Sequence, residues 1–200
     1  MSRNASTEWA FGLQWVLASM AGVALGGAVT MGIVLAVHTF VGGTAEDRVP
    51  GRVLLSMGIG LMQWLVLRRR MRGAGWWVLA SIAGWTAGDA LAWRMFWLIR
   101  DTLGVAANYE FLAFLQALSI GTSLGVLQWL VLRRQFSQSG WWVMANVVGL
   151  SIACVPVGKS LPSGLADAVS ISVVTPALSG LVLVWLLRHS PSIRPARDQS

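Results

Sequence analysis

GLMQWLVLRR, at residues Gly60–Arg69, is the most informative segment of this chain, because it occurs more than once. It recurs as GVLQWLVLRR at Gly125–Arg134, and a shortened copy, VWLLR, occupies Val184–Arg188. Each copy is an apolar run that ends at arginine. Because self-similarity at a regular spacing is the signature of repeated structural units, we expect three related units in the chain.

A second motif lies upstream of each copy. WVLAS occurs at Trp15–Ser19 and at Trp77–Ser81, and WVMAN occurs at Trp142–Asn146. Each unit therefore contains two apolar segments, one with each motif, and is predicted to be a hairpin of two helices. The approximate units are residues 9–72, 73–137 and 138–190, followed by a polar tail at 190–200 that we expect in the cytoplasm.

Composition indicates a single domain embedded in a membrane. Of the 200 residues, 56% are hydrophobic and 12% are charged, whereas a soluble domain carries about 25% charged residues. A helix that crosses a bilayer needs roughly 20 mostly apolar residues. Six segments approach this requirement: Trp9–Phe40, Val49–Leu67, Trp76–Ile99, Phe111–Leu132, Trp141–Gly158 and Ala168–Leu187. We therefore predict an all-α integral membrane protein with six transmembrane helices, the first long enough to tilt or project.

The repeat also predicts how these helices are arranged. Units with an even number of spans share one orientation, whereas inverted repeats contain an odd number, so we expect a parallel repeat with a pseudo-threefold axis along the membrane normal. The odd segments share small residues at a spacing of four, which keeps them on one face and permits close approach in lipid. These residues are Ala18, Gly22 and Gly26, then Ala80, Gly84 and Gly88, then Ala145, Gly149 and Ala153. We expect the three odd helices to pack near the axis and the even helices to pack against them.

Arginine is distributed unevenly between the two sides of this arrangement. With six spans both termini lie on one side, which carries ten arginines against Glu8 and Asp198. An excess of positive charge marks the cytoplasmic side, so we place both termini in the cytoplasm and the protein in the bacterial inner membrane. We expect six of these arginines to set topology and contact anionic lipid: Arg68, Arg69, Arg70, Arg72, Arg133 and Arg134. No nucleic-acid reader motif accompanies them, so nucleic acid is not an expected partner.

Nine of the twelve tryptophans lie near the predicted cytoplasmic helix ends. Indole rings favour the headgroup level of a bilayer, so these residues are predicted to form an interfacial belt. The belt would include Trp15, Trp77 and Trp142.

The segment Gly121–Arg134, followed by GWWV at Gly140–Val143, is shared with Gly60–Arg69 and the GWWV at Gly75–Val78. This pattern resembles uncharacterised multi-spanning membrane proteins of bacteria, of the type common in cyanobacteria, which have repeated GxxxGxxQWLVLRR…GWWV helical hairpins. The resemblance covers approximately residues 54–150. It implies an inner-membrane location and attaches no activity to the motif.

Asp89 is the strongest candidate for a functional residue inside the predicted bilayer, where charge is expensive and faces protein or water. A ligand site at this place would comprise Trp85, Asp89, Trp93, Arg94 and Lys159. The alternative, which we favour, is a structural ion pair with a cation of another hairpin. The cations available for such a pair are Lys159, Arg52 and Arg48, with His38 nearby.

Gln63 and Gln128 precede the tryptophan of the repeated motif. We expect them to make interhelical hydrogen bonds or to contact headgroups. Ser19, Ser81 and Asn146 share one repeat position and are candidates to bond the glutamines of neighbouring hairpins.

The sequence contains no nucleophile and base in local context, no phosphate loop and no metal-ligand cluster. The single Cys154 and two histidines reinforce this reading, so we expect no catalytic residue, no metal and no cofactor. We predict a non-enzymatic binding or assembly subunit for a membrane partner or a small lipophilic ligand. The alternative is a transporter, or the substrate-binding membrane subunit of one, that uses the Asp89 region.

Overall fold

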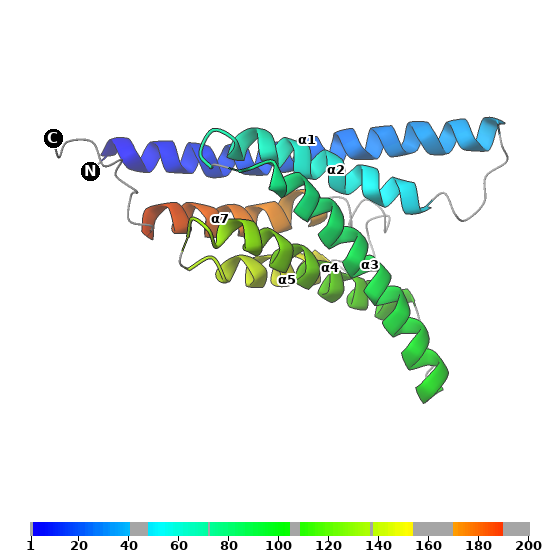
Figure 1. Ribbon diagram of the computed structural model, residues 1–200. Coiled ribbons are helices and arrows are strands. Elements are labelled where there is room, and N and C mark those ends of the chain that lie inside the picture. Colours follow the sequence, from blue (N-terminus) through cyan, green and yellow to red (C-terminus); the bar gives the residue numbers. More distant parts are fainter. Residues whose placement is uncertain are drawn as a thin grey trace, which may run out of the picture.

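The computed structural model describes residues 2–40, 48–71, 73–104, 109–136, 138–153 and 170–189 (Figure 1). Within these ranges the chain is helical apart from short turns and contains no strand. The elements are α1 (Ser2–Phe40), α2 (Arg48–Leu67), α3 (Trp76–Leu103), α4 (Tyr109–Leu132), α5 (Trp141–Ala153), the π-helix η2 (Ser170–Val174) and α7 (Thr175–His189). The all-α prediction is confirmed over the described residues.

The helix boundaries follow local chemistry. α3 ends where Gly104 adopts a left-handed conformation, with φ of 59°, and its N–H donates to the carbonyl of Arg100, which is the usual glycine stop of a helix. The irregularity expected at Pro176 appears as the π-helix just before it, with Pro176 in the first turn of α7. Proline is tolerated there because the first N–H groups of a helix lack intrahelical partners. Pro156 lies outside the described residues.

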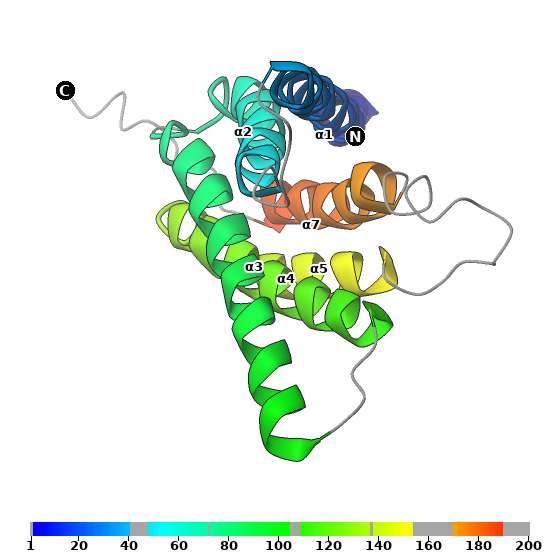
Figure 2. The same ribbon diagram turned by 90° about the vertical axis from the view of Figure 1, so that its right-hand side faces the viewer.

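The helices form a closed ring in chain order. Each helix packs against its neighbours in sequence, and α1 packs against α7 to complete the ring (Figures 1 and 2). The start of α1, the end of α7 and the turns at 68–75 and 133–140 lie at one end of the bundle (Figure 1). We call this the arginine end, because Arg68, Arg69, Arg70, Arg133 and Arg134 lie there.

Small residues bring helices into backbone contact, but with partners other than those predicted. A Cβ atom at Gly88 would lie 2.5 Å from the Cα of Ile120, and one at Gly22 would lie 2.6 Å from the Cα of Ile59. The small ridge of an odd helix therefore faces the even helix of its own hairpin. The expectation that the odd helices pack on one another near the axis is wrong for their backbones, because each is separated from the next by an even helix in the ring.

Three described helices are long and apolar enough to cross a membrane: Glu8–Thr39, Glu110–Leu132 and Ile171–His189. The apolar parts of α2 and α5 are shorter, Gly51–Leu67 and Trp141–Ile152. The surface of the bundle exposes many large apolar side chains, including Leu13, Leu35 and Leu98 at 60–65% exposure. The second half of α1 projects beyond the bundle, as its length predicted, and Gly27 and Gly32 have no neighbour within 4 Å.

Candidate functional site

Three tryptophans from the repeated motif meet at the centre of the ring. Trp15 of α1, Trp77 of α3 and Trp142 of α5 are fully buried, at 0%, 0% and 1% exposure. Their ring centroids are 5.7, 5.7 and 5.4 Å apart, and every pair is T-shaped. Edge-to-face contact is the arrangement that the charge distribution of aromatic rings favours. The odd helices thus meet through these side chains, which we call the tryptophan triad.

Each indole of the triad donates a hydrogen bond to the helix that precedes it in the ring. Trp77 Nε1 donates to Gln63 Oε1 of α2 and Trp142 Nε1 donates to Gln128 Oε1 of α4, both at 2.9 Å. Trp15 Nε1 donates to Ser179 Oγ of α7 at 3.1 Å. These three bonds join each hairpin to the next, and the last joins the two ends of the chain.

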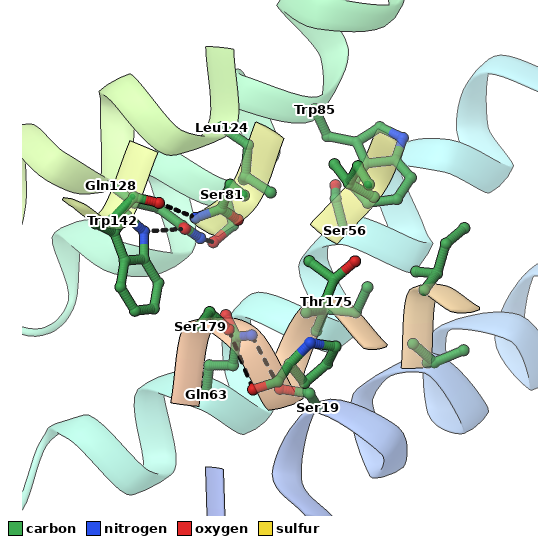
Figure 3. Close-up of a pocket in the computed structure, with 16 residues that line it drawn as sticks. Ser19, Ser56, Gln63, Ser81, Trp85, Leu124, Gln128, Trp142, Thr175 and Ser179 are labelled. Atoms are coloured by element: carbon green, nitrogen blue, oxygen red, sulfur yellow. Dashed lines mark hydrogen bonds between the residues drawn. The ribbon is translucent and has the colours of Figure 1, made fainter. Parts of the chain in front are cut away.

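The glutamines complete the network within their own hairpins. Gln63 Nε2 donates to Ser19 Oγ and Gln128 Nε2 donates to Ser81 Oγ, both at 3.0 Å (Figure 3). Each serine in turn donates to the carbonyl of the tryptophan four residues before it. Asn146, at the same repeat position, donates to the carbonyl of Trp142 at 2.9 Å. Buried polar groups are stabilising only when they are paired in this way.

A small polar cavity adjoins the triad on the side away from the arginine end. Its odd-helix lining residues come one and two turns after the triad tryptophans: Ser19, Val23, Ser81, Trp85, Asn146 and Leu150. The cavity has a volume of about 40 Å³, which suits a few water molecules and is far below the roughly 300 Å³ of the smallest typical ligand pockets. Thr175 also lines it, and its buried Oγ1 has no hydrogen-bond partner among the described residues.

Two sequence predictions are settled by this geometry. The interfacial belt is wrong for Trp15, Trp77 and Trp142, because they form the core, whereas the preceding residues Trp76 and Trp141 are exposed at 63% and 60%. The prediction of interhelical hydrogen bonds from Gln63 and Gln128 is confirmed. Their serine partners belong to the same hairpin, and their indole partners belong to the next one.

Asp89 forms an ion pair with Arg52 of the preceding hairpin. Gln116 Nε2 of α4 also donates to Asp89 Oδ1, at 2.8 Å. The side chains of Asp89 and Arg52 are 17% and 31% exposed, so the pair is partly shielded. The register explains the pairing, because a Cβ at Gly60 would lie 3.0 Å from the Cβ of Ser81. Eight residues further along each antiparallel helix, away from the arginine end, bring Arg52 beside Asp89.

The remaining residues of the predicted Asp89 site are dispersed. Trp85 is buried in a cluster with Ala117, Ile120 and Leu150, and Trp93 packs edge-to-face on Phe96, with centroids 6.1 Å apart. Arg94 is exposed. Lys159 lies outside the described residues. The structure therefore brings together Asp89, Arg52 and Gln116, of which Gln116 was not predicted.

The arginine end combines guanidinium groups with aromatic rings. Arg68 lies 5.1 Å above the ring of Trp64, and Arg133 lies 5.3 Å above that of Trp129 at the same repeat position. Such cation–π pairs are worth about 0.5–1 kcal/mol at exposed sites. Arg72 of the predicted cluster lies outside the described residues.

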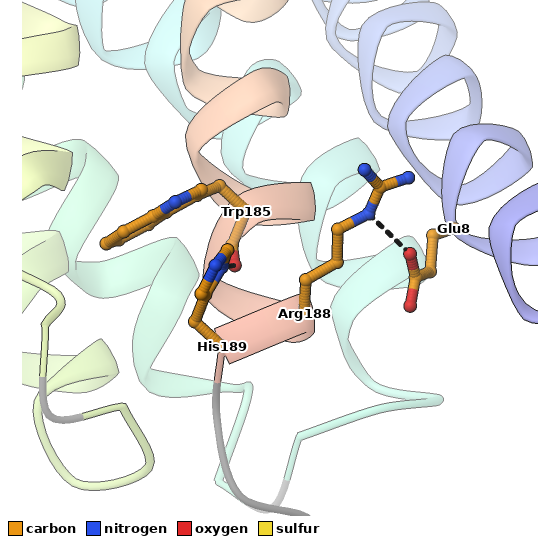
Figure 4. A network of polar contacts seen from close by, with 4 residues as sticks. All are labelled: Glu8, Trp185, Arg188 and His189. Carbon is orange, nitrogen blue, oxygen red and sulfur yellow. Dashed lines mark hydrogen bonds and ion pairs between the residues drawn. The ribbon is translucent and has the colours of Figure 1, made fainter.

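Arg188 is paired differently from the other arginines at this end. Its Nε donates to Glu8 Oε2 at 2.6 Å, and its guanidinium lies 5.3 Å above Trp9. His189 stacks on Trp185 with centroids 4.9 Å apart. Figure 4 shows Arg188 and Glu8 joining the end of α7 to the start of α1.

Comparison of the chain with protein-family models, curated proteins and solved structures finds no match. Within the described residues, no group of three His, Cys, Asp or Glu side chains could hold a metal ion. Function is therefore inferred from the geometry of the sites themselves.

Proposed function

We propose that this protein is a non-enzymatic binding or assembly subunit of the bacterial inner membrane. In this proposal all six helices cross the bilayer as three hairpins about a pseudo-threefold axis, with the arginine end in the cytoplasm. The apolar exposed surface supports membrane insertion, and the arginine clusters support the orientation. The triad supports the symmetry, since the same motif residue of each hairpin meets at one point.

The observation that carries the proposal is the filled centre of the ring. The triad and its hydrogen bonds occupy the axis near the arginine end, and the cavity beside them is only about 40 Å³. A bundle cross-linked in this way from hairpin to hairpin is suited to hold a fixed shape. Its outer surface, rather than its axis, is then the place where a membrane partner or a lipophilic ligand binds.

The transporter alternative receives less support. It depends on Asp89 being available to a substrate or to protons, and this carboxylate is bound by Arg52 and Gln116. Intramembrane charge marks function by default, yet a paired charge between two hairpins also serves structure.

Photo-crosslinking in native membranes tests the proposal. A photoreactive amino acid at Leu17 on α1, and in a separate protein at Leu98 on α3, samples two surfaces that are 54% and 63% exposed. We expect at least one position to give an adduct of discrete mass, and the Asp89→Asn variant to give the same adduct. Monomer alone from both positions, together with a solute uptake that Asp89→Asn abolishes, would contradict the proposal and favour the transporter.

A further inference from the structure

A large groove lies between α3 and α4 at the arginine end. It has a volume of about 980 Å³, at the upper limit of the roughly 300–1,000 Å³ of ligand sites. Its walls are apolar and include Leu79 and Ala83 of α3 and Leu127 and Leu130 of α4. Arg70 and Arg134 lie at its polar rim. The groove thus has an apolar part and a cationic part, arranged along the bundle.

The packing of α3 on α4 explains why space opens here. The two helices are in backbone contact at Gly84 and Gly88, where a Cβ would lie 2.6 Å from the Cα of Leu124 and 2.5 Å from that of Ile120. The groove begins about one turn nearer the arginine end, where Ala80 and Ala83 line it. Small side chains beyond the point of closest approach leave a gap that no other described side chain fills.

The charge at this rim has no protein counterpart within the described residues. Arg68, Arg69, Arg70, Arg133 and Arg134 form no ion pair there, whereas Arg188 at the same end is paired with Glu8. Guanidinium groups bind phosphate with paired N–H donors. Basic pockets between helices on the cytoplasmic side of a membrane protein are suited to anionic headgroups.

We propose that this groove is a binding site for an anionic phospholipid, with its phosphate at Arg70 and Arg134 and an acyl chain between α3 and α4. The inference rests on the proposed function and names the class of its lipophilic ligand. An apolar helix of a partner protein would leave both guanidiniums unpaired, and a free phosphate would leave the apolar walls uncovered. Only an amphiphile with an anionic head matches both parts.

Native mass spectrometry of the full-length protein in mild detergent tests the site. The probes are phosphatidylglycerol and phosphatidylcholine with identical acyl chains, titrated onto wild type and onto the Arg70→Gln/Arg134→Gln variant. We expect wild type to prefer phosphatidylglycerol, and the double variant to bind it roughly thirtyfold more weakly, since each basic residue contributes about a fivefold preference for an anionic membrane component. Arg94→Gln, an exposed arginine of α3 away from the groove, is the matched control and should bind as wild type does.

A second variant examines the apolar part of the groove. Ala83→Phe retains both arginines and places a ring in the acyl-chain path, so it should also reduce phosphatidylglycerol binding. Soluble glycerol phosphate should fail to displace the lipid, and displacement would overturn the lipid assignment in favour of a phosphate site. Equal binding of both lipids by wild type, or undiminished binding by the double variant, would also overturn it. A photo-crosslinked protein partner obtained despite such a result would leave the proposed function standing, whereas the absence of both would remove it.

Discussion

Trp142→Ala is expected to lower the free energy of unfolding by roughly 2–4 kcal/mol, the largest effect of any single truncation considered. In soluble cores Trp→Ala costs about 3–5 kcal/mol. Within a bilayer much of the transfer term is absent, because the unfolded helix is also in an apolar solvent. The cavity and the lost ring contacts at 5.4 and 5.7 Å account for the remainder, and Gln128 Oε1 loses its indole donor.

The adjacent residue provides a matched control for this truncation. Trp141 is 60% exposed, so Trp141→Ala removes the same side chain from the bundle surface and should change stability by less than about 1 kcal/mol. Equilibrium unfolding of both variants in the same detergent measures the difference. Equal losses from the two tryptophans would contradict the assignment of the triad as the core of the bundle.

Gly88→Ala is expected to destabilise the protein by about 1–3 kcal/mol, although it adds only one methyl group. The new Cβ would lie 2.5 Å from the Cα and 2.7 Å from the N of Ile120. These are backbone atoms, so α3 and α4 must move apart to accommodate it. Thermal unfolding in detergent measures the effect.

Gly27→Ala is the control for this substitution. Gly27 is also in the middle of a helix but has no neighbour within 4 Å. Alanine there should be neutral or stabilising by up to about 1 kcal/mol, as expected for an exposed helix interior. If Gly88→Ala were as well tolerated as Gly27→Ala, the close packing of α3 on α4 would be refuted.

The helix positions could be predicted from sequence because they depend on local properties. Apolar run length and the repeat locate α2, α3 and α4 to within a few residues of their ends. The tryptophan triad could not be predicted from composition, since an indole near a helix end favours the interface as well as a core. A signal was present in the WxxxS spacing, because residues four apart share one helix face, and a serine on the same face as a tryptophan indicates a protein-facing surface.

The Asp89 site shows what depends on tertiary register. Sequence identified the aspartate and offered several cations from other hairpins as partners. Selecting Arg52 requires knowing that Gly60 lies against Ser81, which only helix packing determines. Gln116 was missed because a single glutamine in an apolar helix, outside the repeat, has no pattern that distinguishes it. The predicted contribution of Arg94 was wrong, because its side chain is on the exposed face of α3.

The account depends most on α3 crossing the membrane, since this helix carries Asp89 and is not among the three described helices that length and composition alone identify as spans. Cysteine accessibility in spheroplasts tests it directly, with Gly75→Cys and Asp101→Cys introduced singly in a Cys154→Ala background. Both positions are exposed, and a Cβ at Gly75 would meet nothing within 4 Å. We predict that an impermeant maleimide labels Asp101→Cys in intact spheroplasts and labels Gly75→Cys only after permeabilisation. Labelling of both positions from the same side would contradict the proposed membrane topology.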